Sequence, residues 1–557
     1  KGDDPFYYKA LPSDKHFYAY NQEAGRESFS VTIDDRNRYE YYIKPFKYTI
    51  SSGAVKSMMT SYNMINGIPN TANPEINNLV KAKWATDFFV VTDMGGPFNL
   101  VNTQHYYPDI PKALAGAIKA GVDSMTQDEA NPSKTLTNIK SALSQGLLTE
   151  ADIDKAVKNI IRVRFHLGDF DPAANNPYSS LGTSEICAAD HSSLSAQAAR
   201  ESVVLLKNNN ILPLTKSSSV AVIGSMANTI YTDWYSGTLP YKVTPLDGIK
   251  KKAGSVIYAA DNNNNAAVNA AKASKTAIVF VGNDPCCGHL GWAVPRYPSE
   301  GMEAIDRKSI TLEPSDQDLI KAVYAANPNT IVVLVSSFPY ALNWENQNIP
   351  GIVYSSHGGQ EEGNAIADVL FGDYAPAGRL NSTWYSSLDQ IPPITDYDII
   401  KGKRTYMYFD GTPLYPFGYG LSYTTFSYDN IKLSKNSIGT QDKVTVSVDV
   451  TNTGSVSSDE VVQMYVKDVK SSVTRPKKEL KGFKRINLAA GESKTVSFDL
   501  PASELAFWYA TKNDYYVEPG DFDIMIGRSS EDIKLTKTFS VTDGSTNTVV
   551  YGDLSGD

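Results

Sequence analysis

The sequence is poor in cysteine, with only Cys187, Cys286 and Cys287 in 557 residues. Three thiols cannot all pair with one another, and adjacent cysteines join only with backbone strain, so a disulfide framework is excluded. The run from Cys286 to His289 lacks the separated pairs of ligands that a structural zinc site requires. The sequence therefore predicts no metal and no other cofactor.

Long apolar runs and basic runs are also missing from the sequence. No uninterrupted apolar stretch is long enough to span a bilayer, and the formal net charge is −9 at pH 7. An acidic chain without clusters of lysine and arginine has no electrostatic attraction for nucleic acid or for anionic membranes. We therefore expect neither as a partner, whereas a neutral, polar small molecule is compatible with this composition.

Residues 1–168 alternate strand-like segments with segments of helical periodicity. The strand-like segments lie at 55–60, 88–92 and 121–125, and the helical ones at 110–120, at 134–146 and between Thr149 and Gly168. Such alternation is typical of a TIM-type (β/α)8 barrel, but it accounts for only about half of one. We therefore predict that residues 1–168 form the C-terminal half of a catalytic barrel.

The middle of the chain shows a second alternation of strands and helices. After a linker at 169–195, residues 196–390 contain continuous apolar strands such as 276–281 and 330–335. Strands without a polar face are buried on both sides, as in a parallel sheet covered by helices. We predict an α/β sandwich with a mainly parallel sheet.

The last part of the chain has a different pattern. A connecting segment at 391–417 leads to residues 418–541, where apolar and polar residues alternate strictly, for example from Val444 to Val450. Strands of period two that are separated by glycine-rich turns indicate an antiparallel β-sandwich. Residues 542–557 are predicted to be a tail.

Asp93 is the residue that points most directly to a function. It closes the strand-forming run at 88–92 and is followed by Met94 and two glycines. A carboxylate at the C-terminal end of a parallel strand occupies the place where α/β barrels carry their chemistry. A lone aspartate in this position is more often a hydrogen-bond acceptor of the following turn. The residues that accompany Asp93 at the ends of other strands therefore decide whether it is catalytic or only accepts hydrogen bonds from a turn.

Other polar side chains recur where neighbouring strands end. Lys15 and His16 stand together, Arg26 follows them, and Tyr62 comes directly after the strand-like segment 55–60. Cations, a phenol and a carboxylate at successive strand ends converge on one edge of a barrel. This convergence predicts an enzyme active site.

These motifs resemble those of glycoside hydrolase family 3, the family of β-glucosidases and β-xylosidases. The resemblance includes the Lys15-His16 pair, Arg26, the Ser-Tyr-Asn and Asn-Gly-Ile-Pro runs within 61–69, and the Val-Val-Thr-Asp segment at 90–93. It extends to about residue 540, and it implies that the final β-sandwich is of the fibronectin type III kind. The implied activity is that of a retaining, exo-acting β-glycosidase, with a β-glucosidase as the first assignment and a β-xylosidase as the next.

The resemblance also implies a role for each motif residue. Asp93 matches the nucleophile that forms a glycosyl-enzyme, and the four residues at the strand ends match those that bind the sugar in the −1 subsite. These four are Lys15, His16, Arg26 and Tyr62. Met94 is a departure, because many members of the family have tryptophan there as an apolar wall of the sugar site.

Retaining hydrolysis requires a second carboxyl group, which donates a proton to the leaving oxygen. The loop that follows the strand at 276–281 contains Glu300-Gly301 and ends with Asp306-Arg307. In the family this loop carries Glu-Gly shortly before Asp-Arg, and its glutamate is the acid/base. Glu300 matches the dipeptide and is favoured, whereas Glu303 matches the distance to Asp306. Trp234 and Trp292 are candidates for the aromatic walls of the +1 subsite.

Half a barrel would expose the edge of its first strand, so the sequence raises the question of what completes it. Compared with the family, the N-terminal part of the catalytic barrel is expected to be absent from this chain, and an upstream segment or a homodimer partner is expected to supply it. The alternative is a non-catalytic carbohydrate-binding or assembly subunit. The family resemblance implies an oligosaccharide or β-glycoside as substrate and a secreted or periplasmic location.

Overall fold

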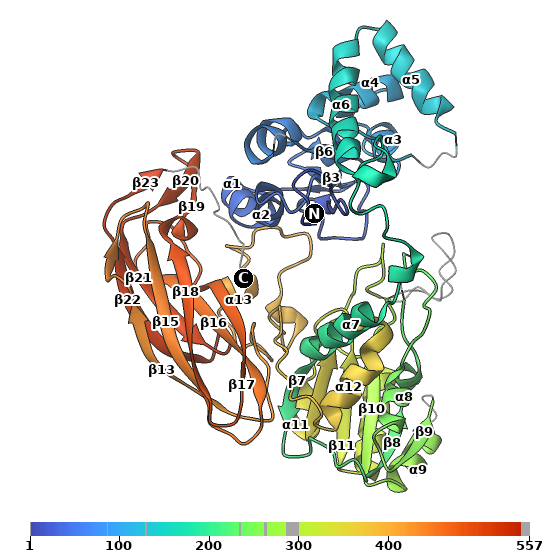
Figure 1. Ribbon diagram of the computed structural model, residues 1–557, viewed down its shortest axis with the longest axis vertical. Helices are drawn as coiled ribbons and strands as arrows, with labels where there is room; N and C mark the ends of the chain where they lie inside the picture. Colours follow the sequence, from blue (N-terminus) through green and yellow to red (C-terminus); the bar gives the residue numbers. More distant parts are fainter. Residues whose placement is uncertain are drawn as a thin grey trace.

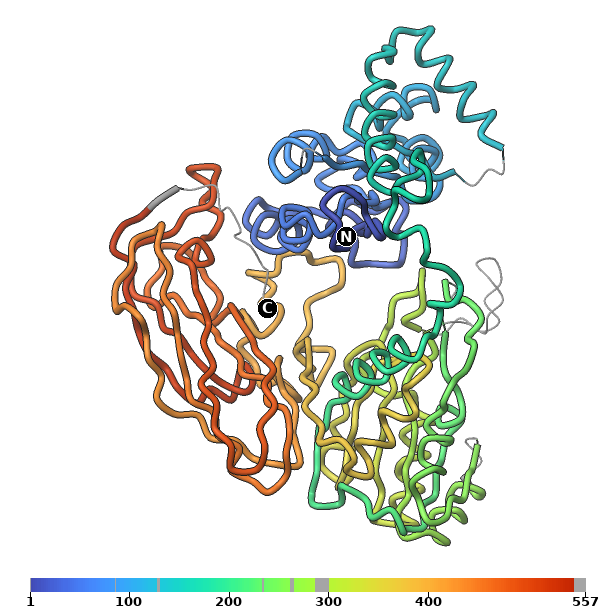
Figure 2. The backbone as a smooth tube through the Cα atoms, in the orientation of Figure 1, coloured from blue at the N-terminus to red at the C-terminus, as the bar shows by residue number. Residues whose placement is uncertain are grey.

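The computed structural model describes residues 2–85, 87–127, 131–232, 235–260, 264–285 and 300–546. Its elements form three domains, shown in Figure 1: an N-terminal α/β domain from β1 to α6, a middle α/β domain from α7 to α12, and a C-terminal β domain from β13 to β23. The chain trace in Figure 2 passes from the N-terminal domain (blue to cyan) into the middle domain and then into the C-terminal domain (orange to red).

The N-terminal domain is built on a small parallel sheet. In the described residues its strands run in the order β1-β3-β6, with bounds Ser13–Phe17, Ser57–Thr60 and Phe89–Val91. A second set of two-residue strands contains β2 (Ser30–Val31), β4 (Met64–Ile65) and β5 (Ile68–Pro69). The segment 121–125, which is predicted to be a strand, makes only one parallel bridge, from Ser124 to Val91.

Helices surround this sheet and enclose its apolar side chains. They are α1 (Asp35–Asn37), α2 (Lys44–Ser51), α3 (Gly96–Asn102), α4 (Ile110–Ala120), α5 (Ser133–Ser144), α6 (Glu150–His166) and two π-helices, Arg38–Tyr42 and Ile76–Trp84. Phe17, Met58 and Val90 of the three strands are fully buried against them. The sheet is therefore anchored by its core, and its carboxyl edge is left to carry polar residues.

Local capping explains where these helices begin and end. The Asp109 side chain accepts the backbone N–H of Lys112 at the start of α4, and Gly121 ends that helix with φ +117°. At α6, Thr149 and Asp152 form a reciprocal capping box. The helices predicted at 110–120 and after Thr149 are thus confirmed, because their end signals are contained in the local sequence.

The middle domain is an α/β sandwich around a six-stranded sheet of order β7-β12-β11-β10-β8-β9. The strands are β7 (Val204–Asn208), β8 (Ser219–Ile223), β9 (Ser255–Ala259), β10 (Thr276–Gly282), β11 (Thr330–Val335) and β12 (Gly351–Ser355). All pairs are parallel except β7 with β12. The helices are α7 (Ala189–Ser202), α8 (Pro245–Lys250), α9 (Asn264–Lys272), α10 (Pro314–Ala326), α11 (Asn343–Asn348) and α12 (Glu362–Leu370).

The C-terminal domain is an antiparallel β-sandwich with a short helix, α13 (Thr405–Tyr408), before it. One sheet has the order β13-β15-β18 and the other β14-β22-β21-β16-β17. Their strands are β13 (Phe426–Leu433), β14 (Ser437–Ile438), β15 (Lys443–Asn452), β16 (Ser458–Asp468), β17 (Glu479–Leu488), β18 (Ser493–Pro501), β21 (Gly520–Gly527) and β22 (Ile533–Val541). A third sheet contains β19 (Phe507–Tyr509), β20 (Asp514–Val517) and β23 (Ser545–Thr546).

The predicted succession of fold classes is confirmed, from an α/β domain through a mainly parallel α/β sandwich to an antiparallel β-sandwich. Residues 547–557 of the predicted tail lie outside the described residues, whereas Ser545 and Thr546 pair with β20. Among the helices of the described residues, none combines the length and the apolar character that crossing a bilayer requires.

Candidate active site

Asp93 lies just beyond β6, at the carboxyl edge of the N-terminal sheet. Its Oδ1 accepts the backbone N–H of Met94 at 2.8 Å, and its Oδ2 lies 3.3 Å from Nε2 of His16. Gly95, with φ +72°, then turns the chain into α3 through a conformation that favours glycine. Both carboxylate oxygens thus have a partner, and the side chain, which is 17% exposed, is held in place yet open to a ligand.

His16, at the end of β1, is the partner of this carboxylate. Burial lowers the pKa of His16, and the charges of Lys15 and Arg26 lower it further, whereas the charge of Asp93 opposes them. The imidazole is therefore neutral at pH 7, and its Nε2 stands against Oδ2 of Asp93 without a full positive charge. A neutral ring at this distance contacts the carboxylate and leaves its negative charge uncancelled.

Two tyrosines complete the surroundings of Asp93. The Tyr62 hydroxyl donates to the backbone oxygen of Met94 at 2.8 Å, and burial, followed by the charge of Asp93, raises the pKa of Tyr62. The ring of Tyr20 lies edge-on to His16 at 5.5 Å and to Tyr62 at 6.2 Å. Its buried hydroxyl has no hydrogen-bond partner in the described residues. Sequence analysis does not select Tyr20, although its position four residues after His16 offers a signal.

Arg26 connects this group to the middle domain. Its Nη1 lies 3.0 Å from Oε2 of Glu23 and 3.1 Å from Oε1 of Glu303, and its guanidinium is 5.8 Å from the ring of Tyr62. Burial opposes the charge of Arg26, but Tyr20 and the two carboxylates raise its pKa, so it remains a cation. Glu303 is therefore the loop carboxylate that reaches the predicted sugar-binding residues.

The loop that carries Glu303 is fixed to the N-terminal domain by backbone hydrogen bonds. The N–H of Glu23 donates to both oxygens of Asp306 at 3.1 Å, and the N–H of Ala24 donates to Oδ2 at 2.8 Å. In return, the N–H of Ala304 donates to Oε2 of Glu23 at 2.9 Å. At the other end of the loop, Arg307 donates to the backbone oxygen of Pro339 at 2.9 Å. The loop thus bridges two domains.

Glu300 has a different environment. Its Oε2 accepts the backbone N–H of Lys308 at 3.0 Å, so the side chain is turned back towards its own loop. The following Gly301 has φ +84°, and a Cβ there would lie 2.3 Å from the ring of Phe338. The two glutamates that the sequence leaves as alternatives are therefore distinguished by their contacts, because Glu303 reaches Arg26.

The remaining predicted residues are placed as follows. The Nζ of Lys15 lies 4.9 Å from the centre of the Tyr235 ring, which extends from the middle domain. Met94 is 44% exposed, and its backbone, not its side chain, makes the contacts with Asp93 and Tyr62. Trp234 and Trp292 lie outside the described residues.

The described residues contain no group of three or more histidine, cysteine, aspartate or glutamate side chains that could hold a metal ion. The segment from Cys286 to His289 lies outside them. What the arrangement offers is a carboxylate positioned by a neutral histidine, surrounding hydroxyl and cationic groups, and a second carboxylate from another domain. These groups are suited to acid–base and nucleophilic chemistry on a polyhydroxylated substrate.

Comparisons with known proteins agree with this organisation. The N-terminal domain of glycosyl hydrolase family 3 matches residues 8–163, the C-terminal domain of the same family matches 203–423, and a fibronectin type III-like domain matches 460–530. The N-terminal match corrects the prediction that the N-terminal part of the barrel is absent, because it begins at residue 8. The physical reason is that several strands here have only two or three residues, too few for a recognisable periodicity.

Relatives of known name cover almost all of the chain. A periplasmic β-glucosidase of Salmonella typhimurium is 35% identical over 95% of this chain and 73% of the relative. A β-xylosidase of Formosa agariphila is also 35% identical, over 95% of this chain and 75% of its own. The crystal structure of a β-glucosidase from Bifidobacterium adolescentis superposes with a TM-score of 0.83 at 29% identity, over 96% of this chain and 77% of that one. This chain belongs to glycoside hydrolase family 3.

Proposed function

We propose that the chain is a retaining, exo-acting β-glycosidase that removes terminal, non-reducing β-linked sugars, with glucose as the first assignment and xylose as the second. The observation that carries this proposal is the Asp93 carboxylate, which His16 orients, with Glu303 of a second domain brought to the same group of residues through Arg26. The names of the relatives, β-glucosidase and β-xylosidase, support these two sugars.

In the proposed first step, Asp93 attacks the anomeric carbon of the bound sugar, and a glycosyl-enzyme ester forms as the glycosidic bond breaks. Glu303 donates its proton to the departing oxygen. In the second step, the same glutamate takes a proton from a water molecule, which attacks the anomeric carbon and releases the sugar with its β configuration retained. In the reactive complex the two carboxyl groups should lie about 5 to 5.5 Å apart.

Glu303 is preferred to Glu300 as the acid/base because of its contacts. Oε1 of Glu303 lies 3.1 Å from Nη1 of Arg26, so this carboxyl group stands beside the residues assigned to the sugar. A sugar hydroxyl that takes over the hydrogen bond of Arg26 would release the Glu303 side chain, which could then approach the leaving oxygen. Glu300, by contrast, is bound to the backbone of Lys308. Glu300 remains the alternative that the dipeptide Glu-Gly supports.

The hydroxyl groups of the sugar are assigned to the polar side chains around Asp93. Lys15, Arg26 and Tyr62 would hold them, and His16 would divide its contacts between a hydroxyl and the nucleophile. We add Tyr20 to this set, because its buried hydroxyl has no partner in the described residues. An unpaired buried hydroxyl is unfavourable, so a substrate oxygen that binds it gains free energy. Such contacts are best used to orient and distort the ring.

The test is hydrolysis of chromogenic β-glucosides and β-xylosides by the purified chain. Asp93→Asn removes the nucleophile while keeping the size of the side chain, and kcat should fall by about 10³-fold or more. Asp318→Asn is a matched control, because Asp318 is exposed on α10, in the middle domain. Turnover of neither substrate class by the wild type would contradict the proposal, as would full activity of Asp93→Asn.

A secreted or periplasmic location and a homodimeric state remain proposals. The relative named as a periplasmic β-glucosidase supports the first of these. Cell fractionation of the native host tests the location, and sedimentation of the purified chain tests whether it forms a dimer.

A further inference from the structure

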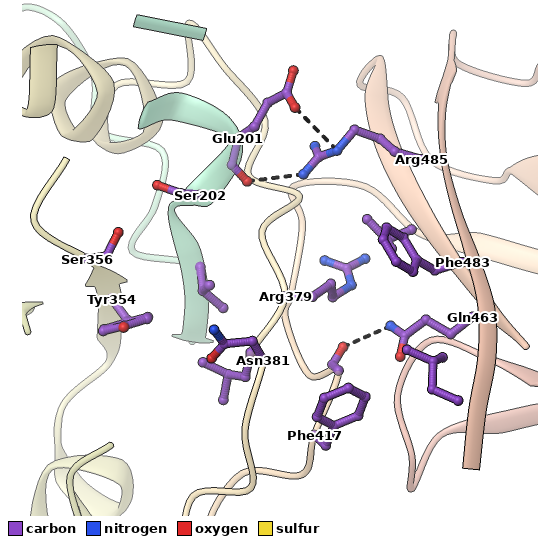
Figure 3. A pocket seen from close by; sticks show the side chains of 15 residues that line it. Glu201, Ser202, Tyr354, Ser356, Arg379, Asn381, Phe417, Gln463, Phe483 and Arg485 are labelled. Atoms are coloured by element: carbon purple, nitrogen blue, oxygen red, sulfur yellow. Dashed lines mark hydrogen bonds and ion pairs between the residues drawn. The ribbon is translucent and has the colours of Figure 1, made fainter. Parts of the chain in front are cut away.

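A pocket separate from the candidate active site lies between the middle and C-terminal domains (Figure 3). Its volume is about 370 Å³, which is within the range of small-molecule sites. The middle-domain side is lined by the end of α7, the start of β7 and the end of β12, and the opposite side by β16 and β17. None of its lining residues belongs to the group around Asp93.

The wall from the C-terminal domain follows from strand register. Gln463 of β16 pairs with Phe483 of β17, and Val461 pairs with Arg485. Directly opposite residues and residues two apart share one face of a sheet, so these four side chains face the pocket together. Phe483 is 67% exposed, more than any other large apolar side chain of the described residues, and Figure 3 shows it among the side chains that line the pocket. An aromatic face is thus offered to a ligand.

The charges on the wall are balanced. Arg379 is 7% exposed and pairs with the buried Glu460 at 2.9 Å. Arg485 pairs with Asp459 at 3.1 Å, and it donates to the backbone oxygen of Glu201 at 3.1 Å. Both arginines that line the pocket therefore have carboxylate partners. An anionic ligand would find no free cation here, so the chemistry favours a neutral ligand.

Several hydrogen-bonding groups on the wall have no partner in the described residues. The Nε of Arg379 is buried and unpaired, although the rest of its guanidinium is bound. The amide of Asn381 and the hydroxyl of Ser356 also make no side-chain hydrogen bond there, and Asn381 is exposed. A buried donor without an acceptor is unfavourable. A ligand with several oxygens would supply what these groups lack.

We propose that this pocket is a second, non-catalytic binding site for a neutral saccharide. The apolar C–H face of a pyranose ring would stack on Phe483, and its hydroxyl groups would bind Asn381, Ser356 and, after a small side-chain shift, Arg379. The choice of a sugar rests in part on the proposed function, whereas the pocket itself does not. Such a site would hold an oligosaccharide on the enzyme surface while Asp93 acts on another chain end.

The test is equilibrium dialysis of labelled cellobiose and xylobiose against Asp93→Asn, in which hydrolysis is blocked. We expect binding at two sites per chain. Adding Phe483→Ala should weaken one site about ten-fold or more and leave the other unchanged. Phe165→Ala is the matched control, because this phenylalanine is also exposed, at 46%, but lies on α6, outside the pocket. Asn381→Ala provides a second variant and should weaken the same site.

Identical binding by Asp93→Asn and by its double variant with Phe483→Ala would overturn the inference. Displacement of the sugar from this site by inorganic phosphate would also overturn it, because it would indicate an anion site. Hydrolysis of a nitrophenyl glycoside by Phe483→Ala alone should stay within about two-fold of the wild type. If the proposed function is wrong, the wild type will not hydrolyse the chromogenic substrates. The dialysis experiment measures binding alone, so its result does not depend on that hydrolysis.

Discussion

Glu23 of the N-terminal domain binds the carboxylate of Asp306 and so holds together two loops of different domains. The backbone N–H of Glu23 donates to both oxygens of the Asp306 carboxylate at 3.1 Å, and the carboxylate of Glu23 accepts the N–H of Ala304 at 2.9 Å. Hydrogen bonds to ionised carboxylates are stronger than neutral ones. These hydrogen bonds fix the position of Glu303, which directly precedes Ala304 on the loop.

Asp306→Ala should therefore reduce activity without removing any group that touches the substrate. A displacement of about 1 Å at a reacting group can cost about 10²-fold in rate, so we expect kcat/KM to fall by about 10 to 10²-fold. Asp306→Asn keeps one acceptor oxygen and should fall less. The measurement is kcat/KM on a chromogenic β-glucoside, with the melting temperature recorded in parallel. Asp318→Ala serves as the matched control, and wild-type kinetics for Asp306→Ala would contradict this role.

The assignment of Glu303 makes a prediction about leaving groups. A general acid matters most when the departing oxygen is a poor leaving group and needs a proton. Glu303→Ala should slow the hydrolysis of cellobiose by about 10² to 10⁴-fold and that of a dinitrophenyl glucoside far less.

Glu300→Ala is the control for this experiment, because Glu300 lies on the same loop but is bound to Lys308. It should show nearly the same loss on both substrates. If Glu300→Ala instead produces the dependence on the leaving group, Glu300 is the acid/base and Glu303 serves only to hold the loop.

The elements that sequence analysis finds are those whose signals are local. The helix Ile110–Ala120 is predicted from the helical spacing of its apolar residues, and the structure shows Asp109 capping its start and Gly121 its end. The strand β15 is predicted because its valines alternate with polar residues, and those valines are buried. Local capping and a period of two can be recognised without knowledge of the rest of the chain.

Contacts across long sequence separations could not be predicted in this way. Arg26 and Glu303 are 277 positions apart, and no periodicity in either segment indicates that they meet. For the same reason the sequence favours Glu300 by its match to the dipeptide, whereas the contact with Arg26 is made by Glu303 of the same loop. Tyr20 is missed because its importance rests on burial without a partner, which only the packed structure reveals.

An aromatic stack is one of the contacts between the C-terminal and N-terminal domains, beside hydrogen bonds such as that of Lys44 with Glu479. The Trp508 ring lies 3.7 Å from the ring of Tyr39 at an angle of 18°, and the hydroxyl of Tyr515 donates to the backbone oxygen of Tyr39 at 2.8 Å. Trp508→Ala should reduce the free energy of unfolding by about 3 kcal/mol, because it leaves a cavity at a buried site.

Guanidinium-induced unfolding measures this loss, and Trp508→Phe is the control that keeps an aromatic ring on Tyr39. The loss from Tyr39→Ala and that from Trp508→Ala should not add in the double variant, because both remove the same stack. Fully additive losses would show that the stack does not join the two domains.

The burial of His357 leads to a prediction of how the stability of the middle domain depends on pH. It follows β12, both of its ring nitrogens are buried, and neither has a hydrogen-bond partner in the described residues. Burial lowers the pKa of His357 to about 4, whereas an unfolded chain has a histidine pKa of about 6.5. Above about pH 6.5 the imidazole is neutral in both states, so it has no effect on stability.

As the pH falls from about 6.5 towards 4, the unfolded state takes up a proton that the folded state does not bind. The free energy of unfolding should therefore decrease over this range, by about 3 kcal/mol at most. His357→Gln abolishes this contribution, so the difference in melting temperature between wild type and variant should change as the pH is lowered, in favour of the variant.

Glu362, on the adjacent helix α12, titrates with the opposite sign. Burial raises the pKa of Glu362 to about 7. Between about pH 7 and pH 4.5 the folded state therefore binds a proton that the unfolded state does not bind. The contribution of Glu362 favours folding as the pH falls. The pH dependence of the wild-type melting temperature therefore shows only the sum of the Glu362 and His357 contributions. Comparing wild type with His357→Gln at each pH isolates the histidine. His191→Gln, at an exposed position of α7, is the control, and a pH-independent difference for His357→Gln would contradict the burial of a neutral imidazole.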